Sequence, residues 1–437
     1  MPRRRRGGSQ GSRLTLAAAR PAALLAAVLA LAPSPAAGEA LAPGLSWTTE
    51  VRPDGPLRLN VIALDRAVYA GRLTTVLSNG TVLGRETVSS MAARHGALAA
   101  VNGTYYVVGG PDDGDPVGAV VAGGRLVSEP VDGREALVVP ADRAAPVRLA
   151  RLAWSGRVTV GARTRLLDGI ERERGVIWGC GGRGGDQPGE RPRHGVPPCR
   201  DPSELVALSP AFGARTPPAG REATEAAVRI ERADGAATSG TVVAVRRGGS
   251  TPIPRDGLVL SGSGDAAALL VAARRGDPVR LATALRAGGR VVDPGGLDAI
   301  LVAGPRLVRD GRVAVRSGAE GFSAPGLYER FVLGANPRTL AGVTAAGTLL
   351  LVTVDGRAPG FSAGVSLPRA AELMRDLGAR DAVNLDGGGS TTMAIRGAVV
   401  NRPSDRVGER PVGEGVLVLA SAAGQARSAW ARGWASK

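Results

Sequence analysis

The chain has 437 residues, of which 44% are apolar and only 3% aromatic, with 64 Gly and 31 Pro. This is a globular composition that supports a sizeable core and favours many short strands and turns over long helices. The formal net charge is +16, but the arginines are scattered among acids and form no runs interleaved with aromatic residues, which argues against nucleic-acid binding. A basic chain of this kind suits an anionic partner such as a cell-surface glycan.

The first forty residues have the pattern of a secretory signal peptide. A basic run at Arg3–Arg6 precedes an apolar segment at 14–32, and small residues follow at 34–38. The alternatives are an uncleaved membrane anchor and a nucleic-acid patch at the arginines. Because the apolar run is Ala-rich, interrupted by Arg20 and short for a span, we expect cleavage near residue 40 and a secreted protein without a stable membrane span.

The only two cysteines, Cys180 and Cys199, bound a loop rich in Gly and Pro. In an exported chain this even count predicts one disulfide, which would stabilise the fold by roughly 3 kcal/mol. The same cysteines with His95 and His194 have the ligand count of a zinc site, but their spacing fits no finger or ribbon. An acidic turn at 111–116 lacks the closing Glu of a calcium loop. The sequence therefore predicts no metal.

The first half of the chain predicts short strands with one helix. Alternation at 47–66 predicts two strands around a turn, and 85–94 has helical character. The apolar strand 97–101 follows and ends at Asn102, where polar side chains gather.

The middle of the chain, 147–256, reads as short strands broken by Gly and Pro and carries the predicted disulfide. A strand at 257–261 then leads into a GxGxxA turn and a helix, which superficially matches a dinucleotide fingerprint. An exported protein has little access to NAD, and no long series of parallel strands follows. We therefore expect no cofactor.

The last hundred residues predict a strand, a helix and a second strand. Leu349–Val354 is apolar on both faces and ends at Asp355, and a helix with Ser366 as its N-cap leads into a strand that ends at Asp386. A right-handed crossover makes these strands parallel. With neighbouring strands about 4.8 Å apart, the two carboxylates are expected roughly 5 to 10 Å apart, which spans both glycosidase geometries.

A run of three glycines follows Asp386, and three hydroxyl residues follow the glycines. Backbone amides at Gly387–Gly389 and the hydroxyls of Ser390–Thr392 predict a cradle for an anionic group. The alternative is an ordinary Gly-rich turn with an Asp at its start.

Six motifs between Thr87 and Ala420 resemble the phosphodiester glycosidases, a family with many exported bacterial members. They are AVNGTYY ending at Tyr106, NPRTLAGV from Asn336, VTVDGR ending at Arg357, NLDGGGSTTM from Asn384, NRPSD from Asn401 and ERPV from Glu409. The resemblance implies an exported glycosidase that cleaves sugar-1-phosphodiesters of the N-acetylglucosamine type in cell-surface polymers or exopolysaccharides. It also implies that the motif residues line the pocket.

We expect an α+β fold with a mixed β-sheet and flanking helices. The expected parts are a signal peptide (1–40), an N-terminal β segment (41–86), a catalytic domain (87–420) with a β-rich insertion (147–256), and a C-terminal tail (421–437).

The predicted site pairs Asp386 with Asp355 as catalytic carboxylates, with arginines clamping the phosphate. The predicted substrate-binding residues are Asn102, Arg338, Thr339, Arg357, Gly387, Gly388, Gly389, Ser390, Thr391, Thr392, Asn401, Asp405 and Arg410. The alternative for Arg338 and Arg410 is ion pairing with acids such as Asp405. The alternatives for the whole chain are a glycan-binding module without turnover and glycosyl transfer to another polymer.

Overall fold

The computed structural model describes residues 38–421 except 54, 132, 176, 179–186, 189–197 and 235–236. Most of the expected signal peptide, the tail from residue 422 and Cys180 lie outside the described residues, so the disulfide stays a prediction. Strand β1 (Gly38–Ala42) contains Ala40, and signal cleavage that preserves this strand would fall before Gly38. In the part of the chain that the structure describes, no helix is long and apolar enough to cross a membrane.

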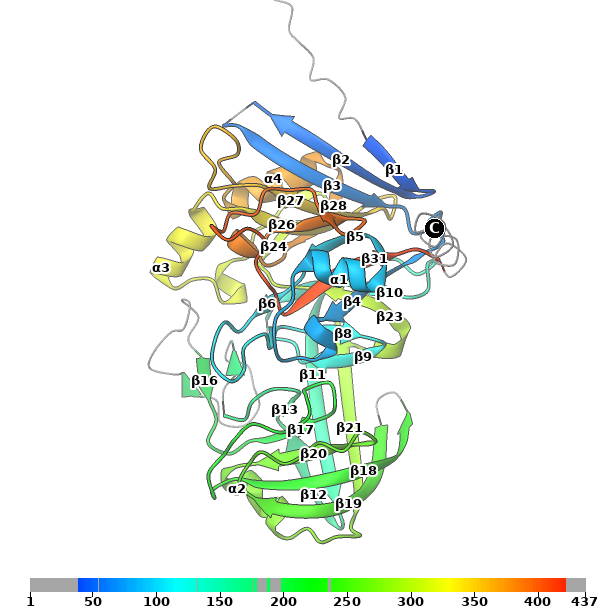
Figure 1. The fold of residues 1–437 in the computed structure, drawn as a ribbon, viewed down its shortest axis with the longest axis vertical. Helices are drawn as coiled ribbons and strands as arrows, with labels where there is room; N and C mark the ends of the chain where they lie inside the picture. Colours follow the sequence, from blue (N-terminus) through cyan, green and yellow to red (C-terminus); the bar gives the residue numbers. More distant parts are fainter. Residues whose placement is uncertain are drawn as a thin grey trace, which may run out of the picture. The chain divides into compact units, whose positions relative to one another are not determined.

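The candidate site lies at the end of an eight-stranded antiparallel sheet (Figure 1). Its strands are, in spatial order, β1, β2 (Leu45–Arg52), β3 (Leu57–Leu64), β27 (Leu349–Val354), β26 (Arg338–Thr344), β28 (Ala379–Asn384), β24 (Arg306–Arg309) and β25 (Arg312–Val313). One face packs against α4 (Leu367–Asp376), whose Leu367, Ala370 and Met374 are fully buried. The apolar face of this helix thus covers the strands that carry the site.

A seven-stranded sheet packs on the other face. It consists of β30 (Ala398–Val399), β29 (Met393–Ile395), β5 (Ala97–Asn102), β31 (Glu414–Leu419), β4 (Arg72–Leu77), β8 (Val120–Ala122) and β9 (Arg125–Ser128). One core cluster joins the two sheets, because Ile62 and Leu351 of the first pack with Val101 and Val416 of the second. Helix α1 (Val88–His95) covers this second sheet and ends at Gly96, as its sequence predicts.

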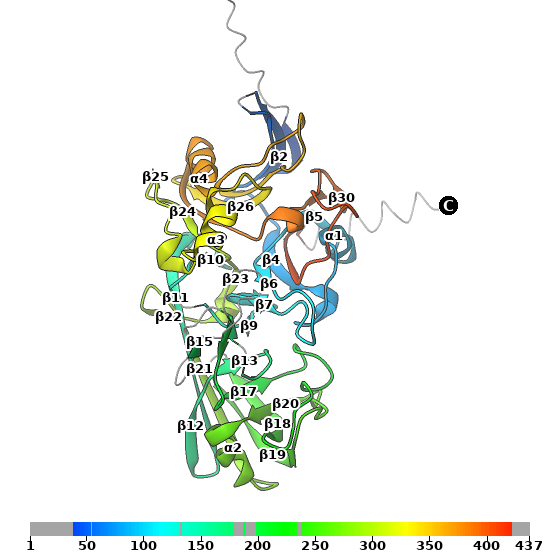
Figure 2. The ribbon, with the colours of Figure 1, turned by 90° about the vertical axis from the view of Figure 1, so that its left-hand side faces the viewer.

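The middle of the chain forms an eleven-stranded sheet with its own core (Figure 2). Its strands are β13 (Gly169–Ile170), β17 (Leu205–Leu208), β20 (Gly257–Gly262), β18 (Thr224–Asp234), β19 (Ala237–Arg247), β21 (Pro278–Ala287), β11 (Arg148–Val160), β10 (Glu135–Pro140) and β23 (Leu297–Leu301), with β12 (Arg163–Leu167) and β22 (Arg290–Val292) at its side. The β-rich character is confirmed, but the sheet runs past residue 256 as far as β23. Helix α2 (Gly264–Val271) follows β20, which accounts for the GxGxxA turn without a nucleotide.

The predicted strand, helix and strand of the last hundred residues are present, but the strands are not neighbours. Ser366 caps α4 by accepting a hydrogen bond from the Arg369 amide at 3.3 Å. Strand β26 pairs antiparallel with both β27 and β28 and lies between them. The two strands therefore run in the same direction, as expected, but they are not adjacent. Neighbouring strands of this sheet are antiparallel throughout, and among the described residues the other two large sheets each contain one parallel pair, β4 with β8 and β13 with β17.

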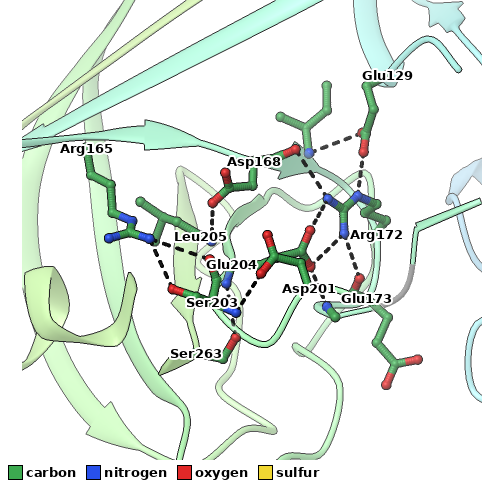
Figure 3. Close-up of polar contacts among 12 residues, drawn as sticks. Glu129, Arg165, Asp168, Arg172, Glu173, Asp201, Ser203, Glu204, Leu205 and Ser263 are labelled. Atoms are coloured by element: carbon green, nitrogen blue, oxygen red, sulfur yellow. Dashed lines mark hydrogen bonds and ion pairs between the residues drawn. The ribbon is translucent and has the colours of Figure 1, made fainter. Parts of the chain in front are cut away.

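A buried ion network holds the β-rich middle region together (Figure 3). The guanidinium of Arg172 donates to both oxygens of Glu204, at 2.6 and 3.0 Å, and its Nε donates to Glu129. Glu204 is fully buried and also accepts from the Gly175 amide. The network thus ties the turn after β9 to the start of β17.

We expect Arg172→Met to destabilise the protein by about 3 to 5 kcal/mol, because it leaves two carboxylates of this network without their cation. Chemical denaturation measures this difference. Arg163→Met, which removes an exposed arginine of β12, is the matched control and should change stability by less than about 0.5 kcal/mol. Equal stability of the two variants would show that the network contributes nothing.

Candidate active site

A cavity of about 860 Å³ opens at the end of β28. Its polar side is formed by the turn after this strand, the arginines around the turn, and Tyr106. Its apolar side is formed by Tyr105 and the segment before β26. The cavity is lined by Tyr105, Tyr106, Val107, Val108, Val117, Arg134, Phe322, Leu327, Glu329, Arg330, Phe331, Gly334, Ala335, Asn336, Arg338, Arg357, Asp386, Gly387, Gly388, Gly389, Ser390 and Arg410.

Asp386 lies in this cavity, directly after β28. Its amide donates to the carbonyl of Gly103 at 2.9 Å, and its Oδ1 accepts from the Gly387 amide at 2.8 Å. Burial raises the pKa of Asp386 to about 6, although the neighbouring Ser390, the Gly387 amide and Arg410 oppose the rise. A carboxyl with a pKa near the working pH is suited to proton transfer.

Asn102 and Thr339 hold the backbone of Asp386 instead of lining the cavity. The Nδ2 of Asn102 donates to the carbonyl of Asp386 at 2.7 Å, and its Oδ1 accepts from Thr339 Oγ1 at 2.6 Å and from the Thr392 amide at 3.1 Å. Asn102 and Thr339 are completely buried. The structure therefore gives these predicted ligand-binding residues a positioning role.

The glycine turn is not an open cradle of amides. The Gly387 amide donates to Asp386, and the Gly388 amide donates to the carbonyl of Pro337 at 2.9 Å. The amides of Ser390 and Thr391 also donate within the turn, which is a 3-10 turn at Gly388–Ser390. The prediction that backbone amides bind the anion is wrong for these four groups, because they already donate to oxygens of the turn and of Pro337. The Gly389 amide is not among these donors and stays a predicted anion-binding group.

The glycines instead let arginines approach the turn closely. A Cβ added at Gly388, which has φ +62°, would lie 3.2 Å from Arg357 Nη2, and one at Gly389 would lie 2.2 Å from Arg410 Nη2. The absence of side chains here is therefore a packing requirement.

The three hydroxyl residues after the glycines are buried, and none of their Oγ atoms has a hydrogen-bond partner within the described part of the chain. Ser390 lines the cavity beside Asp386 and Tyr106. Thr391 and Thr392 are not lining residues. Ser390 is therefore the hydroxyl of the three that lies beside the cavity carboxylate, close enough to oppose the rise in the pKa of Asp386.

Asp355 does not join Asp386 in the cavity. Its carboxylate is 97% buried and its Oδ1 accepts from Asn401 Nδ2 at 3.1 Å and from the Arg402 amide at 3.0 Å. Asn401 in turn accepts from the Met393 amide at 2.7 Å. The predicted catalytic pair is not formed, because β26 separates the two strands and the Asp355 carboxylate is bound by the 401–402 loop. Asp355 and Asn401 fix this loop.

Arg338 is a buried cation without an ion-pair partner among the described residues. Two of its three nitrogens donate to backbone carbonyls: Nε donates to Val365 at 3.0 Å, and Nη2 donates to Gly334 at 3.1 Å and to Phe331 at 2.5 Å. Loss of hydration lowers its pKa to about 10. Pairing with an acid, the alternative for this residue, is wrong for Arg338.

Arg357 and Arg410 differ in how they are held. Arg357 Nη2 donates to Asn336 Oδ1 at 2.8 Å and makes no ion pair with any residue that the structure describes. Arg410 forms a two-pronged ion pair with Asp405, at 2.7 and 2.9 Å, so the ion-pair alternative is confirmed for it. Asp405 supports Arg410 and is not itself a lining residue.

Glu414 is a second carboxyl near Asp386, though outside the cavity lining. It is 96% buried at the start of β31, accepts from the Thr104 amide, and packs against Gly103, whose carbonyl accepts from Asp386. Burial raises its pKa to about 7.

Sequence reasoning missed the aromatic side of the cavity, which Tyr105, Phe322 and Phe331 form. Phe331 lies on a π-helical turn at Tyr328–Leu333, which follows α3 (Pro325–Leu327). The chain has only four Phe and four Tyr, and two of each line this cavity. That scarcity is the signal in the sequence that points to these rings.

Parts of the chain are similar to known proteins. A family model described as Phosphodiester glycosidase matches residues 233–419. The N-acetylglucosamine-1-phosphodiester alpha-N-acetylglucosaminidase of Bos taurus is 33% identical over 103 residues, which cover 23% of this chain and 19% of that protein. The protein of the same name from Mus musculus is 31% identical over 103 residues, covering 23% and 20%. The chain thus matches about a fifth of the length of these curated relatives.

Two solved structures share the fold. A chain from Burkholderia pseudomallei K96243, described as an exported protein, has a TM-score of 0.71 and 33% identity, covering 84% of this chain and 74% of its own. A protein of no stated function from Synechocystis has a TM-score of 0.64 and 21% identity, covering 86% and 62%. The second of these likenesses concerns the fold alone.

Proposed function

The chain belongs to the phosphodiester glycosidase family, and we propose that it is a secreted enzyme that hydrolyses the glycosidic bond of sugar-1-phosphodiesters. The proposed sugar is of the N-acetylglucosamine type, and the proposed source is a cell-surface polymer or exopolysaccharide. The observation that carries the proposal is the juxtaposition of Asp386 with two arginines, Arg338 and Arg357, that have no carboxylate partner among the described residues.

The charge of the cavity favours a phosphate. Five arginines line it against two carboxylates, Asp386 and Glu329, and one of those arginines is already paired with Asp405. A buried cation without a counter-charge is costly, and a bound phosphodiester supplies that charge with charge-assisted hydrogen bonds.

Cleavage of this glycosidic bond needs a general base more than a general acid. When the bond between C1 and the bridging oxygen breaks, the electron pair stays on that oxygen, and the phosphomonoester leaves as an anion whose second pKa is about 6. Arg338 and Arg357 stabilise this charge. Asp386 takes a proton from the water whose oxygen bonds to C1, so this step needs no second carboxylate as a general acid.

The test is to incubate the mature protein with an N-acetylglucosamine-1-phosphodiester and to measure free sugar and phosphomonoester together. Equal amounts of both support hydrolysis. Binding without either product indicates a glycan-binding module, and sugar found on an added polymer indicates transfer.

We expect kcat/KM to fall tenfold per pH unit below about pH 6 and to level off above it, because the base must be ionised and burial raises its pKa to about 6. A pH-rate profile, with circular dichroism at each pH to confirm folding, measures this limb. An activity that increases toward low pH would assign Asp386 the role of an acid.

A further inference from the structure

The cavity divides into two chemically different halves, and only one of them is needed to bind a sugar phosphate. The polar half contains Asp386, Ser390 and Arg410. The other half is walled by Tyr105, Phe322, Phe331 and Leu327. A methyl or hydroxymethyl group would leave this second half unfilled.

The three rings form a fixed apolar wall. Phe322 and Phe331 are stacked with centroids 5.3 Å apart at 21°, and Tyr105 packs against them at 6.1 and 6.0 Å. The Tyr105 hydroxyl donates to the Gly304 carbonyl at 2.8 Å and accepts from Asn384 at 3.1 Å, so its polar end is already satisfied. The guanidinium of Arg134 lies over the Tyr105 and Phe322 rings, 5.6 and 5.2 Å from their centroids, and Phe322 is buried. The apolar surface left to a ligand is therefore that of the half-buried Phe331 and Leu327.

The contacts of the glycine turn give the order of the groups along the cavity. A Cβ at Gly389 would meet Arg410, one at Gly388 would meet Arg357, and one at Gly387 would lie 3.8 Å from Arg338 Cδ. The guanidinium of Arg338 in turn lies over the Phe331 ring, 5.0 Å from its centroid. Along the cavity the groups therefore follow in the order Arg410, Arg357, Arg338 and then the rings.

A phosphate bound by Arg338 and Arg357 sits between these halves. C1 of the sugar must lie near Asp386 for the proton transfer, so the sugar occupies the half with Ser390 and Arg410. The second ester oxygen of the phosphate is then directed toward Phe331. The alcohol group that is esterified to this oxygen therefore reaches the rings.

We propose that the rings are a subsite for an apolar alcohol on the phosphate side of the diester. The substrate class is then a sugar joined through phosphate to an aryl or alkyl group, and this inference rests on the proposed function. Aromatic surfaces bind such groups by removing apolar area from water and by ring stacking.

Three esters of N-acetylglucosamine-1-phosphate test the subsite: methyl, benzyl and octyl. We expect kcat/KM of the benzyl or octyl ester, or both, to exceed that of the methyl ester by about tenfold or more. A benzyl preference points to an aryl alcohol and an octyl preference to a lipid alcohol. Equal rates on all three esters would overturn the proposal.

Phe331→Ala should lower kcat/KM for the benzyl or octyl ester by about tenfold more than it lowers kcat/KM for the methyl ester, which removes the preference. Phe361→Ala is the matched control, because this ring lies outside the cavity lining, against Arg58 and Arg402 at 4.3 and 5.0 Å. It should keep the preference. A Phe331→Ala variant that loses the methyl and benzyl rates equally would show that the ring supports the sugar or the fold, which also contradicts the subsite.

Binding separates a failure of the subsite from a failure of the proposed function. If no ester is hydrolysed, the function is wrong, but calorimetric titration with benzyl phosphate and methyl phosphate still tests the rings. The wild type should bind benzyl phosphate about tenfold or more tightly, and Phe331→Ala should bind both alike. Equal affinity in the wild type overturns the subsite.

Discussion

Asp386→Asn is expected to lower kcat for a sugar-1-phosphodiester by about 100- to 10,000-fold, the range typical for loss of a proton-transfer group. Asn keeps the shape and one acceptor oxygen, which preserves the hydrogen bond from the Gly387 amide. It cannot take a proton from water. Steady-state kinetics with release of free sugar measures the loss.

Two other Asp→Asn variants test whether the loss of kcat is specific to Asp386. Asp381→Asn is the matched control on the same strand, where Oδ1 accepts from the Asp310 amide at 3.2 Å, and it should keep near wild-type kcat. Asp355→Asn keeps one acceptor oxygen for the 401–402 loop and should lose less than tenfold. A loss at Asp355 as large as that at Asp386 would return Asp355 to the catalytic pair.

The same variant carries a stability signature. The folded-state pKa of Asp386 is raised to about 6 from 3.8, so the folded protein holds the proton more tightly than the unfolded chain. The protonated Asp386 therefore stabilises the folded state. This stabilisation is complete below about pH 3.8 and is lost as the pH rises through about 6. Asp386→Asn should therefore be more thermostable than the wild type at about pH 7.5, with the difference vanishing near pH 4. Equal melting curves at about pH 7.5 would contradict the raised pKa.

Local sequence patterns predict the elements around the site well. Apolar runs give β27 and β28, and a Ser cap with a stop at Gly378 gives α4, because these signals act over a few residues. Strand partners follow from contacts between distant segments. The place of β26 between β27 and β28 therefore does not follow from the strand, helix and strand pattern, and Asp355 is not among the residues that line the cavity with Asp386.

The roles of the site residues depend on hydrogen-bond accounting that a sequence does not contain. NLDGGGSTTM identifies Asp386, which lines the cavity. Yet the same motif predicts an amide cradle, whereas the amides of Gly387 and Gly388 donate to protein oxygens and arginines lie close against the turn. Arg338 reads as a phosphate clamp or an ion pair, and only the structure distinguishes the two, since its hydrogen bonds go to carbonyls.

Arg338→Met is expected to lower kcat/KM by a factor that corresponds to about 2 to 5 kcal/mol, the cost of removing one partner of a buried charge pair. The physical reason is that Arg338 is 99% buried and the described residues offer it no carboxylate, so in this proposal the phosphate is its counter-charge. Arg380→Met is the control, because this exposed arginine pairs with Asp310 away from the cavity. It should leave kcat/KM unchanged.

Phosphate binding separates the role of Arg338 from that of Asp386. Inorganic phosphate that binds the folded protein at a hundred times its dissociation constant stabilises it by about 2.7 kcal/mol, which a thermal melt detects. We expect this shift in the wild type and in Asp386→Asn, and we expect Arg338→Met to lose it, because the arginine holds the anion while the carboxylate handles the proton. If Arg338→Met keeps the full phosphate-induced shift, the anion is held by Arg357 and Arg410 instead, and Arg338 serves only to anchor the carbonyls of Phe331, Gly334 and Val365 beside the cavity.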